Sequence, residues 1–233
     1  MTSILSLGSN SGGQLATGDM DDAHYLKQSL FDGKIQNTEN ISKDVGWRVV
    51  GGGNHSFAWS TDGSRLFACG LNKAGEIALP VNETNQPTLT WTPVQLPTEG
   101  YVAQIACGWE HSILLNDLGQ LFAAGSNSFG QLGTGTDTKR NAACVSDSSV
   151  KYWTPVLTSA DSNDATTHLR FIAVACGLRH SLALTDKGHV YGWGANRHGQ
   201  LGVASKDIKY ANISQMVLVS EGLPPISAIA CGR

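Results

Sequence analysis

The sequence has few charged residues, and no part of it is both long and apolar. Charged residues make up 15% of the 233 positions, and the formal net charge is −3. Proteins that bind nucleic acid by neutralising phosphates usually carry a strong basic excess, so this balance argues against direct nucleic-acid binding. No run of about 18 apolar residues occurs, which argues against a membrane span.

The N-terminus lacks the features of a secretory signal. "MTSILSLGSN" has no basic segment and no long apolar segment. In an intracellular chain the 5 cysteines are expected to stay reduced, so we predict no disulfide. A sustained 3.6-residue apolar period is also missing, which argues against a helical protein. Hydrophobic residues still reach 41%, so a chain of this length can bury a core.

The sequence does have abundant glycine and a repeated unit. The 27 glycines occur in pairs and at recurring offsets, which indicates many tight turns. Three histidines are each followed by serine, an apolar stretch, an Asp-containing turn and a second apolar stretch. The three units close with "AGEIAL", "FGQLGT" and "HGQLGV" at nearly the same offset from the histidine. The His-Ser pairs are His55-Ser56, His111-Ser112 and His180-Ser181.

Each unit has the pattern of a β-hairpin, because two short apolar stretches flank a Gly-containing turn. A unit of this size cannot bury both of its faces alone, so the units must stack. A linear stack leaves open sheet edges, whereas radial packing around an axis leaves only short, protected ones. The sequence therefore predicts an all-β fold, and specifically a β-propeller.

Two motifs carry a family resemblance. "IACGWEHSILL" at 105–115 and "VACGLRHSLAL" at 174–184 resemble the first half of the regulator of chromosome condensation (RCC) repeat. "GSNSFGQLG" at 125–133 and "GANRHGQLG" at 194–202 resemble its second half. The family forms seven-bladed propellers, so the resemblance implies RCC-type blades in one domain, apparently incomplete in this chain.

The motifs also give approximate repeat boundaries. We predict three complete repeats flanked by two partial ones, and two polar stretches between them that read as variable inserts. The complete repeats span about 48–80, 103–135 and 172–204, the partial ones 1–18 and 226–233, and the inserts 18–46 and 134–170.

The repeated residues allow a chemical interpretation and a structural one. Cys107 with His111 and Cys176 with His180 could together supply four zinc ligands. The first unit has Gly51 where the cysteine would stand, which favours small buried thiols instead. A nucleophile and its base should occur once, held by a third group, whereas His-Ser occurs three times. We therefore predict no metal, no cofactor and no catalytic residue, and a hydrogen-bonding role for the His-Ser pairs.

Recognition is expected at the positions that vary between repeats. The free positions between Gly and His, and those in the closing motif, hold aromatic and basic residues of the kind enriched at protein interfaces. An alternative weighed equally for the tryptophan is packing against the neighbouring blade. The candidate partner-binding residues are Trp109, Glu110, Arg179, Arg197 and His198, with the inserts as the next candidates.

Within the family, "GGGNHS", "CGLNKAGE", "ACGWEHSILL" and "GSNSFGQLG" look most like two branches. These are the secretion-regulating guanine nucleotide exchange factors and the fungal alpha-tubulin suppressors, also called killer-toxin-insensitivity proteins. The second resemblance implies a non-catalytic adaptor in the cytoplasm and nucleus. Its partner would be a small zinc-binding diphthamide-synthesis protein, and it would support Elongator-dependent tRNA wobble-uridine modification. The alternative is a nucleotide exchange factor for a small Ras-like GTPase.

Overall fold

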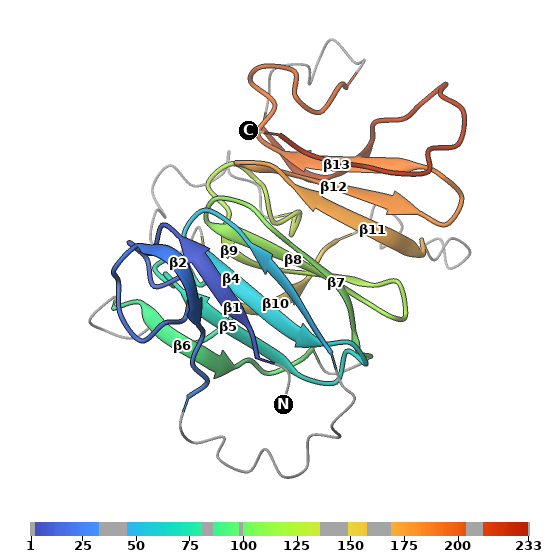
Figure 1. Ribbon diagram of the computed structural model, residues 1–233. Coiled ribbons are helices and arrows are strands. Elements are labelled where there is room, and N and C mark those ends of the chain that lie inside the picture. The colour runs from blue at the N-terminus through green and yellow to red at the C-terminus, as the bar shows by residue number, and fades with distance from the viewer. Residues whose placement is uncertain are drawn as a thin grey trace.

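The computed structural model describes residues 3–32, 46–80, 86–97, 100–135, 149–157, 169–203 and 212–232. Every regular element in these ranges is a β-strand (Figure 1). No helix in the described ranges is long and apolar enough to cross a membrane. The predicted all-β fold is therefore confirmed.

The strands form one two-stranded sheet followed by three four-stranded sheets. All are antiparallel, and in each four-stranded sheet the strands lie side by side in chain order. The two-stranded sheet contains β1 (Leu5–Gly8) and β2 (Ala23–Gln28). The first four-stranded sheet contains β3 (Trp47–Gly51), β4 (His55–Ser60), β5 (Leu66–Gly70) and β6 (Thr88–Pro93).

The other two four-stranded sheets repeat this order. The second contains β7 (Val102–Cys107), β8 (His111–Asn116), β9 (Leu121–Ser126) and β10 (Ser149–Pro155). The third contains β11 (Phe171–Cys176), β12 (His180–Thr185), β13 (Val190–Gly194) and β14 (Ile213–Leu218).

Apolar side chains between neighbouring sheets form the core. Phe57 of β4 belongs to one buried cluster with Ile105 and Leu114 of the second sheet. Ile113 belongs to another with Trp193 of the third sheet. Alternate residues of a strand face opposite sides, so a central sheet needs apolar residues on both. This explains why β8, with the sequence HSILLN, is buried along its whole length.

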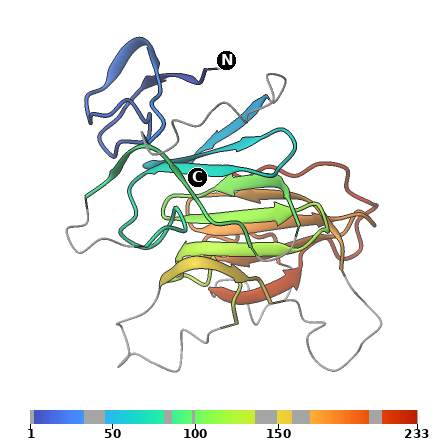
Figure 2. The same cartoon turned by 90° about the horizontal axis from the view of Figure 1, so that it is seen from below.

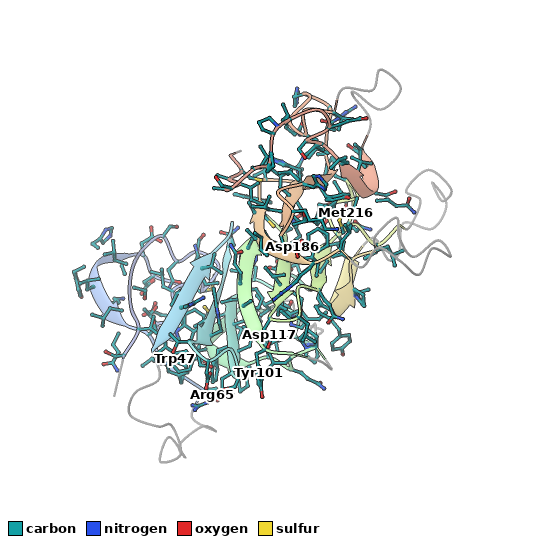
Figure 3. All side chains as sticks on the ribbon, turned by 90° about the vertical axis from the view of Figure 1, so that its right-hand side faces the viewer. Trp47, Arg65, Tyr101, Asp117, Asp186 and Met216 are labelled. Atoms are coloured by element: carbon teal, nitrogen blue, oxygen red, sulfur yellow. The ribbon has the colours of Figure 1, made fainter. Side chains whose placement is uncertain are left out.

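The two ends of the sheets carry different loops. In each four-stranded sheet a short turn joins the first strand to the second; these turns are 52–54, 108–110 and 177–179. The loops after β5, β9 and β13 lie at the same end, as the pairing of His55 with Gly70 across β4 and β5 shows. We call this the histidine end. The Asp-Gly turns after β4, β8 and β12 lie at the opposite end, the aspartate end, where Figure 3 labels Arg65, Tyr101 and Asp117.

The aspartate end joins each sheet to the next through the backbone. The amide of Val102 donates to the carbonyl of Gly63 at 3.0 Å, and the amide of Phe171 donates to the carbonyl of Gly119 at 3.0 Å. Gly63 has φ +74°, and a Cβ there would collide with the backbone of Val102. Glycine is therefore required at this turn for both its conformation and its closeness to the next sheet.

The described sheets follow one another along an arc and do not close into a ring (Figure 2). Contacts between successive four-stranded sheets come mainly from their first and second strands. Strands β2 and β10 lie within 18–46 and 134–170, the ranges that the sequence presents as variable inserts. Each of these ranges therefore contains the last strand of a sheet as well as connecting residues.

Candidate functional site

The repeated histidines and serines form hydrogen bonds between successive sheets at the histidine end. Nε2 of His55 lies 2.8 Å from Oγ of Ser112, and Nε2 of His111 lies 3.0 Å from Oγ of Ser181. The Ser112 hydroxyl donates to the carbonyl of Glu76 at 2.8 Å. The hydroxyl oxygen is thus left to accept from His55, which assigns the proton of that imidazole to Nε2.

The second pair has the same geometry, because the hydroxyl of Ser181 donates to the carbonyl of Gln131 at 2.9 Å. Both serine hydroxyl protons therefore point at backbone carbonyls rather than at a base. In this arrangement the histidine is a donor to serine, the reverse of the relation that activates a serine nucleophile. The outer members of the series, Ser56 and His180, are buried as well.

Burial holds these imidazoles in the neutral form. Desolvation lowers the pKa of His55 to about 4. Desolvation, with smaller effects of the neighbouring His55 and His180, lowers the pKa of His111 to about 3. The Nδ1 atom of His111 is buried and has no hydrogen-bond partner in the part of the chain that the structure describes. Protonating that ring would place a charge in a site with little to stabilise it.

The glycines before each histidine allow the turns to pack together. The Gly53 amide donates to the carbonyl of Gly108 at 3.0 Å, and the Trp109 amide donates to the carbonyl of Leu178 at 3.2 Å. A Cβ at Gly108 would overlap the ring of His111. The turns at the histidine end thus form one series in which the backbone of each is hydrogen-bonded to the next, and a glycine in each lies against the imidazole of its own sheet.

The closing motifs contain a second repeated set of hydrogen bonds, made by an Asn and a Gln side chain, which was not predicted from the sequence. In the loop after β9, Oδ1 of Asn127 accepts from the amide of Leu132 at 3.0 Å, and Oε1 of Gln131 accepts from the amide of Phe129 at 2.8 Å. Asn196 and Gln200 make the equivalent bonds after β13. The sequence signal for these hydrogen bonds is the Asn that occupies the same place in "GSN" and "GAN".

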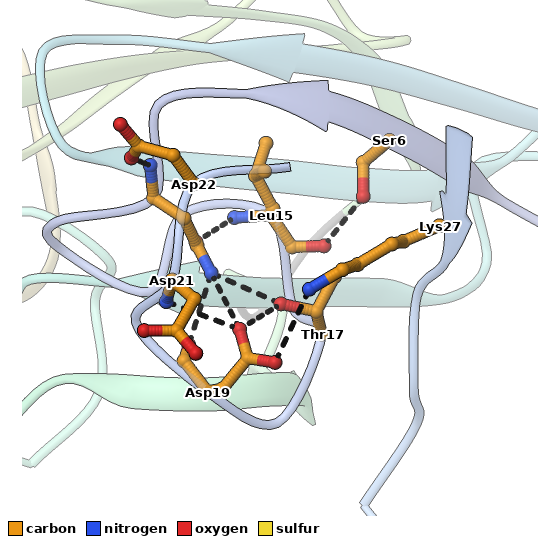
Figure 4. A network of polar contacts seen from close by, with 8 residues as sticks. Ser6, Leu15, Thr17, Asp19, Asp21, Asp22 and Lys27 are labelled. Carbon is orange, nitrogen blue, oxygen red and sulfur yellow. Dashed lines mark hydrogen bonds and ion pairs between the residues drawn. The ribbon is translucent and has the colours of Figure 1, made fainter. Parts of the chain in front are cut away.

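The loop between β1 and β2 has the same asparagine bond, within the polar network of Figure 4. Oδ1 of Asn10 accepts from the amide of Leu15 at 2.9 Å, and Nδ2 donates to Oγ1 of Thr17 at 3.0 Å and to the carbonyl of Asp19 at 3.0 Å. Asp19 also forms an ion pair with Lys27 at 3.5 Å. The polar residues of this loop therefore shape the loop itself.

One repeat departs from this pattern, because Glu76 stands where the others have Gln. Its Oε2 accepts from the amide of Ala74 at 2.8 Å, as the glutamine oxygens do in their loops. The side chain is buried, and desolvation raises its pKa, with a further contribution from the charge of Glu110. The Glu76 carboxylate is therefore close enough to Glu110, in the turn that also holds Trp109, for the two charges to interact.

The cysteines of the two Cys-His pairs, which we expect to be small buried thiols and not zinc ligands, lie in buried surroundings. Sγ of Cys176 donates to the carbonyl of Ala106 at 3.5 Å, which places it between two sheets. Burial raises the pKa of Cys107 to about 12, so this thiol stays protonated. Across the described ranges no group of three or more Cys, His, Asp or Glu side chains is placed to hold a metal ion. The absence of a metal and of a disulfide in the protein stays a prediction.

All five candidate partner-binding residues lie at the histidine end. Trp109 is 40% exposed, and its ring also lies against Gly53 of the preceding turn, so it both packs on the neighbouring sheet and presents a surface. Glu110 and Arg179 are exposed, and the guanidinium of Arg179 lies 4.5 Å from the centre of the Phe129 ring. Arg197 and His198 are exposed in the loop after β13.

Comparison with known proteins identifies the repeat. Models of the regulator of chromosome condensation (RCC1) repeat match residues 64–115, 119–184 and 187–233, and a second such model matches 102–131 and 171–200. The secretion-regulating guanine nucleotide exchange factor of Bos taurus is 31% identical over 85% of this chain, and that of Mus musculus is 33% identical over 85%. The chain spans 49% of the length of each of these relatives.

A solved structure shows the same fold. Human WBSCR16 superposes with a TM-score of 0.76 at 23% sequence identity, with 99% of this chain covered and 51% of that one. The sheets described above thus have the arrangement of about half of that protein.

Proposed function

Because the chain belongs to the regulator of chromosome condensation (RCC1) repeat family, we propose that it is a propeller that acts by binding another protein at its histidine end. One observation carries this proposal. Recurring side chains such as His55, His111 and Gln131 make hydrogen bonds between or within the sheets, whereas the five candidate residues, which differ between repeats, are exposed at this end. Exposed Trp and Arg are enriched at protein interfaces.

The proposed activity involves no covalent chemistry. The His-Ser pairs are held by inter-sheet hydrogen bonds, and burial keeps His55 and His111 neutral. A nucleotide exchange factor needs none of these groups as a nucleophile or a base, since it acts by binding a GTPase in its nucleotide-free form. Either kind of partner is therefore compatible with the same surface.

We propose a small GTPase as the first partner class. The similarity to the secretion-regulating guanine nucleotide exchange factors covers 85% of this chain and supports this choice. The second candidate is a small zinc-binding diphthamide-synthesis protein, with a role in tRNA wobble-uridine modification in the cytoplasm and nucleus. It is supported by the resemblance of "GGGNHS" and "CGLNKAGE" to the fungal alpha-tubulin suppressors.

Affinity purification of the tagged protein, followed by identification of the partner, tests the proposal. We expect Trp109→Ala to weaken the complex roughly thirtyfold or more, because truncating a buried interface tryptophan typically costs over about 2 kcal/mol. Tyr101→Ala is the matched control, since Tyr101 is an aromatic that is 55% exposed at the aspartate end. Both variants must first melt like the wild type.

The identity of the partner separates the two candidates. A captured GTPase that releases labelled GDP faster with the protein supports exchange activity, and a small zinc protein supports the adaptor role. A partner whose affinity is unchanged by Trp109→Ala but reduced by Tyr101→Ala would move the binding surface to the other end.

A further inference from the structure

Three basic side chains are gathered at the histidine end around the third four-stranded sheet. Arg179 lies in the turn before β12, and Arg197 and His198 lie in the loop after β13; all three are exposed. Within the described ranges the only ion pair joins Lys27 to Asp19, far from these residues in the sequence. Arg179 and Arg197 therefore have no carboxylate partner within the described ranges, although the whole chain has a net charge of −3.

Arg179 is held in place from two sides. Its guanidinium lies 4.5 Å from the centre of the Phe129 ring, which belongs to the preceding sheet. Its carbonyl accepts from the amide of Ala195 at 2.8 Å, in the loop that continues to Arg197. Stacking on an aromatic ring orders the planar guanidinium and leaves N–H groups at its edge free for a bidentate acceptor. Less side-chain entropy is then lost when a ligand binds.

The exposed tryptophan lies next to this basic group. The amide of Trp109 donates to the carbonyl of Leu178 at 3.2 Å, so the turn that carries the indole is bonded to the turn that carries Arg179. Trp109, Phe129, Arg179, Arg197 and His198 lie on these hydrogen-bonded turns and neighbouring loops of the histidine end, and we call this group of residues the basic strip. It begins with an aromatic ring that is 40% exposed and includes two arginines.

We propose that the basic strip binds a short acidic segment of the protein partner, with an apolar side chain on Trp109 and carboxylates on Arg179 and Arg197. This deepens the proposed function and depends on it. Carboxylates match the forked donors of arginine, and such charge-assisted pairs are the stronger hydrogen bonds. A nucleic acid fits less well, because binding by phosphate neutralisation usually needs a strong basic excess and the net charge of this chain is −3.

The probe is a fluorescein-labelled synthetic peptide with one leucine followed by a run of glutamates. Its counterpart has lysines in place of the glutamates. We expect the full chain to bind the acidic peptide, and Arg179→Glu to weaken binding by about tenfold or more, since it replaces a charge-assisted hydrogen bond with a like-charge repulsion. Arg179→Lys should give an intermediate loss, because lysine keeps the charge but loses the stacked fork.

Lys187→Glu is the matched control, because Lys187 is an exposed cation of the same sheet at the aspartate end. It makes the same charge change, so a purely long-range effect of net charge would weaken binding equally in both variants. Each variant is first checked for an unchanged melting temperature. The loss of affinity for the acidic peptide caused by Arg179→Glu should become smaller as the salt concentration is raised, because salt screens exposed charges.

Four results would overturn the inference: no binding of the acidic peptide, equal binding of the lysine peptide, equal loss with Lys187→Glu, or tighter binding of a single-stranded RNA of similar length. The proposed function fails differently. If the purified partner depends on Trp109 but the acidic peptide does not bind, the histidine end is still the interface and only its acidic ligand is wrong.

Discussion

At the scale of single residues, His-Ser pairs that look like chemistry in the sequence are inter-sheet hydrogen bonds in the structure. His55 donates to Ser112 of the next sheet, and His111 donates to Ser181 of the sheet after that. The serine then donates to a carbonyl of the histidine's own sheet, at Glu76 or Gln131. Each pair thus satisfies a buried carbonyl that would otherwise lack a donor.

Replacing His111 by alanine is expected to lower the free energy of unfolding by about 1–3 kcal/mol, because Ser181 loses a donor in a buried site. Urea denaturation followed by circular dichroism measures this. His198→Ala is the control, since the His198 side chain is exposed and should change stability by less than about 0.5 kcal/mol. Unchanged stability of His111→Ala together with loss of partner binding would show that His111 belongs to the binding surface instead.

At the scale of the elements, each closing loop is organised by an Asn and a Gln that accept hydrogen bonds from backbone amides. Glu76 occupies the glutamine position after β5, and its buried carboxylate accepts from Ala74. Gln131 makes the same bond without a charge. The loop geometry therefore needs an oxygen acceptor of this length and does not need its negative charge.

Glu76→Gln is expected to stabilise the protein at pH 7. Desolvation raises the pKa of Glu76 in the folded state, so its ionised form costs stability as pH rises through that pKa. The gain from Glu76→Gln should therefore be largest at neutral pH and disappear as pH falls below the ordinary value of 4.5. Urea midpoints of both proteins between pH 4 and 8 check this; a gain that grows toward acid pH would contradict the burial argument.

At the scale of the whole molecule, neighbouring four-stranded sheets are joined to each other at both the histidine end and the aspartate end. The histidine end uses side chains and Gly-containing turns, and the aspartate end uses backbone bonds such as Val102 to Gly63. Most long-range contacts link neighbouring sheets or strands, as expected for repeat proteins, whose stability is a sum over units and their interfaces. Weakening one interface should therefore affect the sheets on either side of it.

Acid is expected to destabilise the whole arc through its buried histidines. Their folded-state pKa values are depressed, to about 4 for His55 and about 3 for His111, below the ordinary 6.5. The unfolded chain binds more protons below pH 6.5, so stability is full above that pH and is lost as pH falls toward these values. Thermal melts from pH 7.5 to 4 measure the loss, and the pH slope should be smaller in His111→Ala. A melting temperature that stays constant over this range would refute the neutral-histidine assignment.

The repeat could be predicted because its residues are specified locally. The short apolar run in "HSILL", the glycines at the turns and the recurring motifs are all local features that indicate buried strands joined by tight turns. The fold and the family could thus be predicted from the sequence. Strand β2 was missed within an apparent insert, because its sequence AHYLKQ is mostly exposed and carries little apolar periodicity.

The sequence alone therefore predicts the repeat unit, with its strands, its turns and the positions that vary between repeats. The neighbours of those variable positions are known only from the tertiary structure. Whether Trp109 packs or projects depends on Gly53 of the neighbouring turn, and whether Arg179 is ordered depends on Phe129 of another sheet. Such contacts join residues far apart in the chain, and local patterns carry no information about which side chains meet when the sheets stack side by side.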